Sequence, residues 1–496
     1  MTAVLNSGIV TIARICPRKT HMVLPASATF RLSSLAALCL SGILAACGTS
    51  TTKIQGTLRA STTGQWEAPL PGTENTLALA QWWDSWNDPL MRELQAHAQQ
   101  HSPSIAQAAA RITQARAEAS AAGATLWPSL DFTASITSNR DYPIPTGGKQ
   151  TIRSTGLDAR WEIDLFGANS AARNSMVARM EARGSEWHDA RISLAAEVAN
   201  TYVALRSCEA QADAAKQIAL SQQVSQRLQE QRVVAGFLSP LDLAQQRVLL
   251  ANADSREQQQ QVNCAVLIKS LVVLIDLPEA VLKERLKTGR AALPQAGNFI
   301  VDSLPANTLL KRPDIRASMQ NLVASAREID AAQARRYPSI SLLGNINLLG
   351  IRIAGQSTDA SNWSFGPALT LPLFDAGKRK ADVELAQARH AEALAAFRYQ
   401  TLMAVREVEE SLIRLDLVNR EIQQHQHIET LHTLSMQSAQ AGWELGSLSL
   451  LEKEEAQRQQ LAGQQQKWQL QRDRASAWIA LYKAVGGDWT IPGDQP

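Results

Sequence analysis

The sequence predicts a mainly α-helical protein with a membrane β-barrel, in which two similar half-domains each supply a strand pair and a long antiparallel helical hairpin. Three observations support this fold class. Landmark residues recur at one fixed offset, short segments alternate apolar and polar residues, and two long stretches of good helix formers contain no proline. Together they indicate an internally duplicated chain rather than a row of unrelated globular domains.

Composition excludes several functional classes. The chain has 496 residues, of which 45% are hydrophobic and 19% charged, and its formal net charge is +3. Such a small positive excess gives no basic footprint, so we expect no nucleic-acid partner. After position 47 no apolar run approaches the ~20 residues of a membrane-spanning helix. A polytopic helical membrane protein is therefore excluded, whereas a β-barrel is not, because barrel strands leave a weaker hydropathy signal.

The N-terminus predicts export. Residues 32–46 are uncharged and follow a group of basic residues, Arg14, Arg18, Lys19 and Arg31. The uncharged stretch is too short to span a membrane and ends in small residues, as a secretory signal does. We therefore expect 1–46 to be a signal peptide, with Met22 as an alternative start.

The cleavage region Leu44-Ala45-Ala46-Cys47 resembles a bacterial lipobox. The resemblance implies that Cys47 is lipidated and becomes the first mature residue; the alternative is a plain signal peptide with a chance cysteine. Gly48 in second position favours passage to the outer membrane, where several acyl chains would anchor the protein firmly. The Thr-, Ser- and Gly-rich residues that follow suit a flexible tether, which we place at 47–81.

A repeat organises the rest of the chain. Four pairs of landmarks are each 210 positions apart: Pro103 and Pro313, Pro128 and Pro338, Gly167 and Gly377, Gly236 and Gly446. A unit of this length is too long for a solenoid repeat, so it indicates duplicated half-domains. We expect a first repeat at 82–276, an equatorial linker at 277–306, a second repeat at 307–485 and a tail at 486–496.

Each half opens with an Ala-rich helical stretch, about 84–123 and 313–336, followed by an aromatic-Pro-Ser turn. Alternating segments come next, at 130–138 and 157–165 in the first half and at 340–349 and 363–371 in the second. In 157–165 the odd-numbered residues are apolar and the even-numbered ones charged, which places one face in an apolar medium and the other in water. Such segments are near the length of a membrane-crossing strand; the alternative is a small soluble sheet packed on helices.

The remainder of each half is a helical hairpin. The expected helix pairs are 167–235 with 241–275 and 377–446 with 450–485. The first helix of each pair would extend roughly 100 Å at ~1.5 Å per residue, and this length argues strongly against a compact globular domain. Glycine and either proline or serine mark both reversals, which gives two long antiparallel hairpins.

Two cysteines lie within the first hairpin. If the chain reverses near Gly236, Cys208 and Cys264 come to lie opposite each other. In an oxidising compartment they would form a disulfide that ties the paired helices. Because helix register drifts over this distance, two free, buried thiols are the equally weighted alternative.

Four strands cannot close a barrel, and a membrane sheet with open edges leaves backbone groups without partners. The chain must therefore oligomerise. Two copies would give eight strands and a filled interior, whereas three give twelve strands and room for a pore, so we prefer a homotrimer. The charged even-numbered residues would line that pore: Asp158, Arg160, Glu162 and Asp164.

Taken together, these residues resemble the TolC-type outer-membrane factors and, more closely, the lipidated efflux lipoproteins of the NodT group. The motifs that carry the resemblance occur in order, mostly twice, between 82 and 485: Arg312-Pro313-Asp314-Ile315, Trp127-Pro128-Ser129, Tyr337-Pro338-Ser339, Leu165-Phe166-Gly167 and the glycines at the hairpin tips. The family implies a homotrimer with a twelve-stranded barrel in outer-membrane lipid and a periplasmic helical tunnel. It also implies docking to a periplasmic adaptor and an inner-membrane pump.

The resemblance implies passive export of small molecules through a gated duct. Two alternatives stay open. One is an exit duct for type I protein secretion, and the other is a lipid-anchored periplasmic coiled-coil scaffold without a pore. Lipidation mildly favours small-molecule efflux over protein secretion.

The resemblance to this family also implies a gate at the tip of the second hairpin. Glu452 and Glu455 lie six and nine positions after the tip glycine, Trp443 precedes it by three, and Asp242 is the equivalent carboxylate of the first half. Three copies of a carboxylate would form a ring that attracts cations and whose members repel one another. The alternative is that acids at a helix N-terminus complement the helix dipole. Leu448 stands where some relatives have arginine, which puts an arginine–carboxylate lock between subunits in doubt.

Both tips are also the expected adaptor contacts, although simple turn chemistry would explain the same residues. They comprise Gly236, Phe237, Leu238, Ser239 and Pro240 in the first hairpin and Gly446, Ser447, Leu448 and Ser449 in the second.

No catalytic signal is present. His97 and His101 lie four apart, and His425, His427 and His432 cluster, but neither group comes with a metal-binding framework. No nucleotide-binding loop or nucleophile elbow occurs. We therefore expect no enzyme, no metal and no cofactor.

Overall fold

The computed structural model describes residues 65–71, 79–140, 149–301, 305–353 and 356–488. All of these residues belong to one compact unit. The expected signal peptide and Cys47 lie outside the described residues.

The first half begins with three short helices: η1 (Leu79–Trp86), α3 (Pro89–His101) and α4 (Pro103–Ala124). The Ala-rich stretch that the sequence predicts to be helical over about 84–123 is thus divided among three helices. Ser102 is extended between α3 and α4, with φ −60° and ψ 130°. The cause is Pro103, which lacks an N–H and disfavours the helical conformation of the residue before it. In the second half the matching helix α9 (Pro313–Ala334) also starts at a proline.

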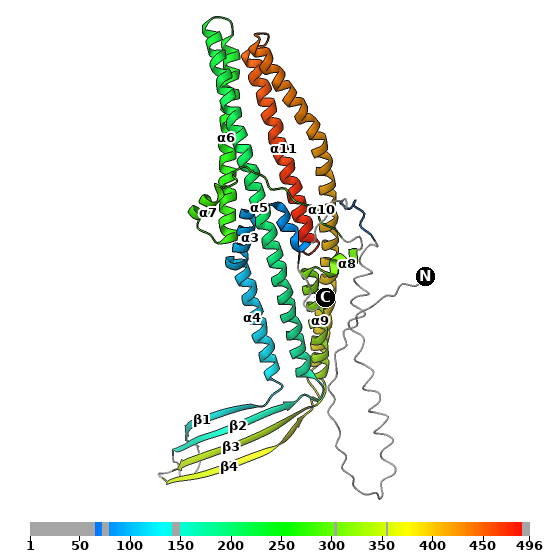
Figure 1. Ribbon diagram of the computed structural model, residues 1–496. Helices are drawn as coiled ribbons and strands as arrows, with labels where there is room; N and C mark the ends of the chain where they lie inside the picture. Colours follow the sequence, from blue (N-terminus) through cyan, green and yellow to red (C-terminus); the bar gives the residue numbers. More distant parts are fainter. Residues whose placement is uncertain (1–64, 72–78, 141–148, 302–304, 354–355, 489–496) are drawn as a thin grey trace, which may run out of the picture. The chain divides into compact units, whose positions relative to one another are not determined.

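The four strands form one antiparallel sheet in chain order, β1 (Ser129–Asn139), β2 (Gln150–Ile163), β3 (Ser339–Ile353) and β4 (Gln356–Thr370). The sheet lies beyond the ends of α4, α5, α9 and α10, to which its strands connect (Figure 1). Because β1 and β4 are the edge strands, each has one side without a partner strand among the described residues.

One face of the sheet is apolar. A row of directly paired residues crosses all four strands: Phe132, Leu157, Ile346 and Trp363. All four side chains are exposed, from 45% for Leu157 to 77% for Trp363. The alternation that the sequence shows in 157–165 thus extends across the sheet, and none of the described helices packs along this face.

Strand β2 ends earlier than the alternation predicts. It stops at Ile163, and the Asp164 carboxylate accepts hydrogen bonds from the backbone N–H groups of Asn169 (3.0 Å) and Ser170 (2.7 Å) at the start of α5. Asp164 was expected to line a pore together with the other charged residues of this segment. It instead lies past the strand end and satisfies N–H groups that have no partner within the helix.

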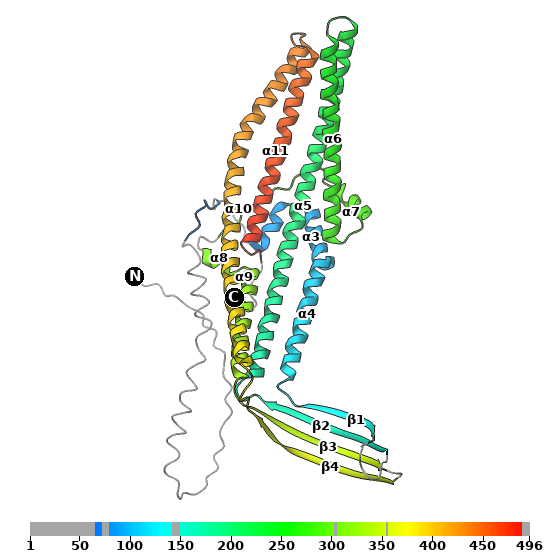
Figure 2. The same ribbon diagram turned by 180° about the vertical axis from the view of Figure 1, so that it is seen from behind.

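Two long hairpins contain most of the helical residues that the structure describes: α5 (Ala168–Val234) with α6 (Pro240–Ile275), and α10 (Lys378–Glu444) with α11 (Leu450–Ala484). The hairpin tips lie together at the end of the helices opposite to the sheet (Figures 1 and 2). Helix α5 also packs along α4, α9 and α11, and α10 packs along α9. Among the described residues, no helix is both long and apolar enough to cross a membrane.

Small residues let α5 and α9 approach closely. They recur on α5 at spacings of three and four, which places them on one face. They are all buried: Ala171, Ser175, Ala178, Ala182 and Ser185. A wider side chain on this stripe would separate the two halves of the chain near the sheet.

The expected linker is partly helical and belongs to the main core. It contains α7 (Glu279–Leu286), and α8 (Pro305–Leu310) begins at its end. Phe299 packs at 5.3 Å from the ring of Trp82 and at 5.1 Å from the ring of Trp478, and Trp82 stacks on Tyr482 at 4.9 Å. This aromatic cluster joins the first helix, the linker and the end of α11, and no sequence pattern indicates it.

The last part of the expected tether is not free. Trp66 is buried, and the Glu409 carboxylate of α10 accepts hydrogen bonds from the backbone N–H groups of Glu67 (2.7 Å) and Ala68 (2.8 Å). The segment 65–71 therefore docks on the second hairpin before the first helix begins.

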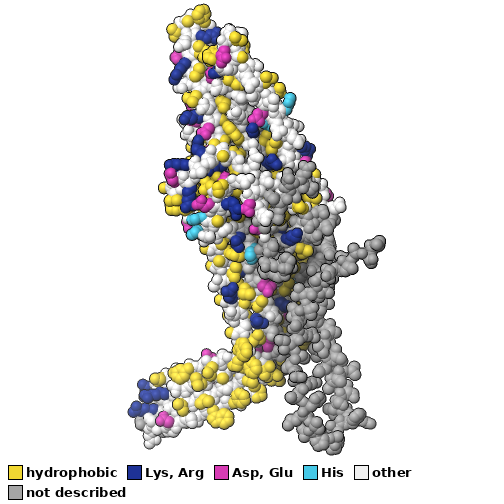
Figure 3. All heavy atoms as spheres, in the orientation of Figure 1, with side chains coloured by type: hydrophobic (Ala, Val, Ile, Leu, Met, Phe, Trp, Pro, Cys, Tyr) yellow, Lys and Arg dark blue, Asp and Glu magenta, His cyan; other side chains and the backbone are white. Residues whose placement is uncertain are grey.

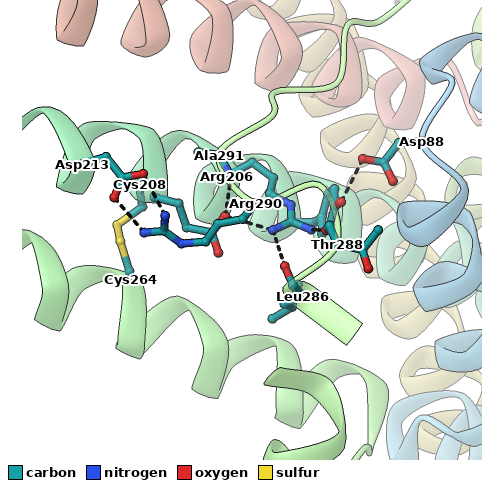
Figure 4. A network of polar contacts seen from close by, with 11 residues as sticks. Asp88, Arg206, Cys208, Asp213, Cys264, Leu286, Thr288, Arg290 and Ala291 are labelled. Atoms are coloured by element: carbon teal, nitrogen blue, oxygen red, sulfur yellow. Dashed lines mark hydrogen bonds and ion pairs between the residues drawn. A yellow bond between two sulfur atoms is a disulfide. The ribbon is translucent and has the colours of Figure 1, made fainter. Parts of the chain in front are cut away.

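The first hairpin carries a covalent tie and a polar clip (Figure 4). Cys208 and Cys264 form a disulfide between α5 and α6, with Cα atoms 5.6 Å apart. Nearby, the fully buried guanidinium of Arg206 donates to the carbonyl oxygens of Leu286 and Thr288, and Arg290 forms a bidentate pair with Asp213 at 2.8 Å. These contacts hold the chain after α7 against α5.

We expect loss of the disulfide to lower stability without unfolding the hairpin. It closes a loop of sequence separation 56, for which constraint of the unfolded chain is worth about 2–4 kcal/mol. The Cys208→Ser, Cys264→Ser protein should therefore unfold at a lower temperature than wild type under non-reducing conditions. Thermal unfolding followed by circular dichroism measures this. Reductant should remove the difference, and a difference that persists in reductant would contradict the explanation.

Candidate gate and docking site

The two hairpin tips share one local design. Gly236 and Gly446 end their helices with φ of 79° and 72°, a backbone region that residues with a Cβ rarely adopt. Three residues later, the hydroxyls of Ser239 and Ser449 accept a hydrogen bond from the backbone N–H of the third helical residue. The repeat therefore conserves a glycine stop and a serine cap at each reversal.

Glu452 takes part in capping α11. Its carboxylate accepts hydrogen bonds from the backbone N–H of Ser449 at 2.7 Å and from the Ser449 hydroxyl at 2.8 Å, which completes a capping box. The bonds from Ser449 lower the pKa of Glu452 below its usual value. Asp242 likewise accepts from the Ser239 hydroxyl at 2.7 Å. Both carboxylates thus cap the N-terminus of a helix, which is the alternative to a gate role that the sequence allows.

Glu455 lies in a different contact. Its carboxylate pairs with Arg458 at 2.7 Å, and this guanidinium lowers the pKa of Glu455 despite partial burial. Arg458 also donates to the buried hydroxyls of Ser221 (3.0 Å) and Ser225 (2.9 Å) on α5. One side chain therefore connects the second hairpin to the first, close to the tips. We call Glu455, Arg458, Ser221 and Ser225 the tip latch.

The sequence does not reveal the tip latch as a unit. The spacing of three between Glu455 and Arg458 on a helix suggests their pairing. The two serines, by contrast, lie more than 200 positions away, in the other half of the repeat. A serine in a helix carries no sign of the partner that it meets.

Trp443 and Leu448 shape the second tip. The Lys453 ammonium lies 5.4 Å from the centre of the Trp443 ring and pairs with Glu454, which is buried. A Cβ on Gly442 would meet Leu448 at 2.7 Å, so the tip folds tightly back on its helix. Glu454, although it lies in the first turns of α11, is therefore not a solvated side chain.

Both tips expose apolar side chains. Phe237 is 78% exposed in the first tip, and Leu445 is 84% exposed beside Gly446 in the second. Leu238 and Leu448 are half-buried, and the remaining tip residues are exposed. Exposed apolar residues at two neighbouring turns offer a contact surface for another protein.

The histidines do not gather metal ligands. His97 stacks on His101 with ring centres 4.2 Å apart, and the Nδ1 atom of His97 lies 3.0 Å from the carbonyl oxygen of Ile275. In the part of the chain that the structure describes, no group of three or more His, Cys, Asp or Glu residues could hold a metal ion.

A buried ionic cluster lies farther from the tips, where the second half meets the end of the chain. The Arg312 guanidinium forms a bidentate pair with Asp314 (3.0 and 2.8 Å) and also binds Glu407 (2.7 Å) and the carbonyl oxygen of Ala484 (2.9 Å). Arg312 is only 5% exposed. It connects the start of α9 with α10 and the end of α11, a role that the Arg312-Pro313-Asp314-Ile315 motif does not show by itself.

Asp189 of α5 lies beside this cluster. Burial and repulsion by Asp314 raise the pKa of Asp189 to about 6. The folded state therefore binds this proton more tightly than the unfolded state, so Asp189 makes the protein less stable as the pH rises from about 4 to about 6.

We expect Asp189→Asn to stabilise the protein at neutral pH and to leave it nearly unchanged near pH 4. The gain should be of the order of 1–3 kcal/mol, because asparagine removes a charge that burial disfavours. Thermal unfolding midpoints measured from pH 4 to 8 would show it. Asp330→Asn, at an exposed carboxylate of α9, is the control and should show no such trend. If the midpoints of wild type and variant change with pH in the same way, the raised pKa of Asp189 is contradicted.

Comparison with known proteins adds to this geometry. Residues 94–268 and 304–487 match the model of a family described as outer membrane efflux protein. The chain is 30% identical over 470 residues to the pyoverdine export outer membrane protein OpmQ of Pseudomonas putida, covering 92% of this chain and 97% of that protein. It is 28% identical to nodulation protein T of Rhizobium leguminosarum bv. viciae, covering 86% and 89% of the two chains.

A solved structure shows the same fold. The Campylobacter jejuni CmeC outer membrane channel aligns with a TM-score of 0.72 at 21% identity, covering 84% of this chain and 90% of that one. At this identity the likeness shows the fold alone.

Proposed function

The chain belongs to the outer membrane efflux protein family and is an efflux channel of the outer membrane, and we propose that three copies assemble into one gated duct. In this duct, twelve strands enclose a barrel in the outer membrane, and the hairpins enclose a tunnel in the periplasm. Its relatives are channels rather than enzymes. Transport through the duct is passive in this proposal, and the energy comes from an inner-membrane pump.

The sheet carries this proposal. In the part of the chain that the structure describes, its edge strands β1 and β4 each have one edge without a partner strand, and its apolar row from Phe132 to Trp363 is exposed. Pairing of β4 in one copy with β1 in the next satisfies both edges and turns the apolar row toward lipid.

The opposite face supplies the polar lining. Directly paired residues on that face are Asp131, Asp158, Asn345 and Ser364. Arg160 and Glu162 share it by alternation along β2. Three copies of such a row leave a wet interior suited to polar cargo.

Helix α6 offers a surface for a neighbouring copy. Exposed apolar residues follow it at spacings of four, seven and fourteen: Leu241, Val248, Val262, Val266 and Val273. A stripe that returns every seven residues is the pattern of helices that pack side by side. We propose that α6 contacts α10 of the next copy, where Leu402, Ile413 and Leu417 are also exposed.

We propose that the hairpin tips close the duct and bind a periplasmic adaptor. Gly236 to Pro240 and Gly446 to Ser449 would form the adaptor surface. Glu452, Glu455, Trp443 and Asp242 would form the gate. Because Glu452 and Asp242 already cap helices, Glu455 is the carboxylate whose pairing changes most directly when the second tip moves.

The remaining parts of the proposal concern anchoring and cargo. Cys47, outside the described residues, would be the lipid anchor in the outer membrane. The relative OpmQ is named for pyoverdine export, and we propose that this duct likewise exports small molecules rather than proteins.

The test is the mass and conductance of the purified protein. We expect a detergent-dependent trimer that conducts ions in planar bilayers. A lipid-anchored scaffold would instead give a protein that dissolves without detergent once Cys47 is replaced by serine, and that outcome would overturn the duct. A gene for an efflux pump beside this one, rather than a protein-secretion transporter, would decide between the two kinds of cargo.

A further inference from the structure

Toward the free end of the sheet, the apolar face carries positively charged side chains. On β2, Arg153 lies four residues beyond Leu157 and on the same face, because side chains alternate with a period of two. On β3, Arg352 lies four residues beyond Leu348 on that face. Figure 3 shows dark blue Lys and Arg side chains gathered at the end of the sheet farthest from the helices, beyond the yellow apolar ones.

The strand register brings the two arginines together. Arg153 pairs with Gly350, and Arg352 pairs with Thr151, so the two guanidinium groups extend from diagonal positions on β2 and β3. Such diagonal neighbours lie within reach of long side chains. Neither arginine forms an ion pair with any other residue in the part of the chain that the structure describes.

Gly350 leaves a space between the charged groups. It lies between Arg153 and Asp359 in one row of the register. A Cβ at Gly350 would meet the Asp359 carboxylate at 3.1 Å and the Arg153 Cβ at 3.9 Å. The result is a shallow hollow of about 530 Å³, lined by Arg153, Thr155, Leu348 and Asp359 among others.

Among the described residues, the charges at this end are mostly positive. Arg140 follows the end of β1 and Lys149 precedes β2, both are exposed, and Asp359 is the described acid beside Arg153 and Gly350. A charged side chain on a lipid-facing strand is costly at the bilayer centre but costs little at headgroup depth. Arg352 lies about 13 Å along the strand beyond Leu348, toward the free end of the sheet and away from the apolar row.

We propose that Arg153 and Arg352 bind the phosphate groups of a phosphorylated glycolipid in the outer leaflet. The inference rests on the proposed function in two respects, that the apolar face meets lipid and that the helices lie in the periplasm. The free end of the sheet then lies in the outer leaflet, because the helices leave its other end toward the periplasm. The planar guanidinium forms two parallel hydrogen bonds to a phosphate, and the apolar residues below it accommodate acyl chains.

Lipid binding by the purified trimer tests the proposal. The probes are diphosphorylated lipid A, the same lipid without phosphates, and inorganic phosphate. Native mass spectrometry counts bound lipid, and the thermal midpoint reports stabilisation. We expect the diphosphorylated lipid to bind wild type preferentially, and its affinity to fall about tenfold or more in the Arg153→Ala, Arg352→Ala protein.

Arg160→Ala is the matched control, because Arg160 lies on the same strand but on the opposite face of the sheet. It should bind lipid as wild type does. Arg153→Lys keeps the positive charge but loses the planar guanidinium that forms two parallel hydrogen bonds, so this variant should bind the diphosphorylated lipid with intermediate affinity. Equal binding by wild type and the double variant would overturn the proposal, as would displacement of the lipid by inorganic phosphate at equal phosphate concentration.

These outcomes are separable from failure of the duct itself. A detergent-dependent, conducting trimer that does not distinguish the two lipids would overturn only the lipid site. A protein that needs no detergent would overturn the membrane-inserted sheet, and the lipid site with it.

Discussion

Replacing Arg458 by alanine is expected to open the channel at its periplasmic end. Arg458 holds α11 of the second hairpin against α5 of the first through the hydroxyls of Ser221 and Ser225. A hydrogen bond from a charged donor is worth about 1.5–3 kcal/mol, so losing even one shifts the ratio of open to closed channels about tenfold or more. Single-channel recordings in planar bilayers should show a higher mean conductance and more frequent open events.

Other variants separate the latch from a general loss of structure. The Ser221→Ala, Ser225→Ala protein should reproduce the effect, because it removes the acceptors and keeps Arg458. Arg247→Ala is the control: Arg247 pairs with Glu230 at 3.1 Å within the first hairpin and joins no element of the second. A conductance of Arg458→Ala equal to that of wild type, in an intact trimer, would contradict the latch.

The carboxylates need a different substitution. Replacing both Glu452 and Glu455 by alanine should raise the conductance, but the change at Glu452 also removes the capping box of α11. Glu455→Gln is therefore the cleaner variant, since it removes one charge of the supposed ring and weakens the pairing with Arg458. If it leaves both conductance and ion selectivity unchanged, the gate role of Glu455 is lost.

The sequence predicts the elements of this fold better than their connections. The ends of the hairpin helices follow from local chemistry, because Gly236 and Gly446 need a positive φ, and the alternation around Leu157 indicates a strand. The strand limits do not follow in the same way, since β2 begins at Gln150 and β4 at Gln356, before the alternating segments 157–165 and 363–371. The family resemblance is confirmed by the match over both halves. Local chemistry also explains why the Ala-rich stretch is divided, because Pro103 disfavours a helical conformation at Ser102 and so separates α3 from α4.

The site contains contacts that no local pattern encodes. Arg458 meets serines of the other half, and Arg312 meets Glu407 almost 100 positions later. Both pairs depend on how two hairpins pack, and the packing of small residues such as Ala178 and Ala182 allows many registers. The charge of a residue does not show its role either. The alternation predicts Asp164 in a lumen, whereas its carboxylate caps the start of α5.

The largest loss of stability is expected for Arg312→Ala. The variant leaves Asp314 buried without its bidentate partner and beside Asp189 and Glu407, which repel it. Removing one partner of a buried ion pair lowers the free energy of unfolding by about 3–5 kcal/mol, more than a typical substitution does. Thermal unfolding of the detergent-solubilised trimer at neutral pH should therefore show a strongly lowered midpoint. Arg327→Ala on the same helix is the control, because its pair with Asp330 is exposed and contributes at most about 1 kcal/mol.

The pH dependence identifies the mechanism. In wild type, burial acts to raise the pKa of Asp314, but Arg312 and Gln400 outweigh it and lower the pKa, so this group adds stability that is lost only as the pH falls through its folded-state pKa. Without Arg312, burial and the neighbouring carboxylates raise the pKa of Asp314 instead. The sign then reverses, and the variant should regain stability as the pH falls toward 4, where Asp314 is protonated. Adding Asp314→Asn to the variant should restore part of the stability at neutral pH. If acid fails to narrow the gap between the variant and wild type, the loss comes from packing around the missing side chain rather than from the unpaired charge.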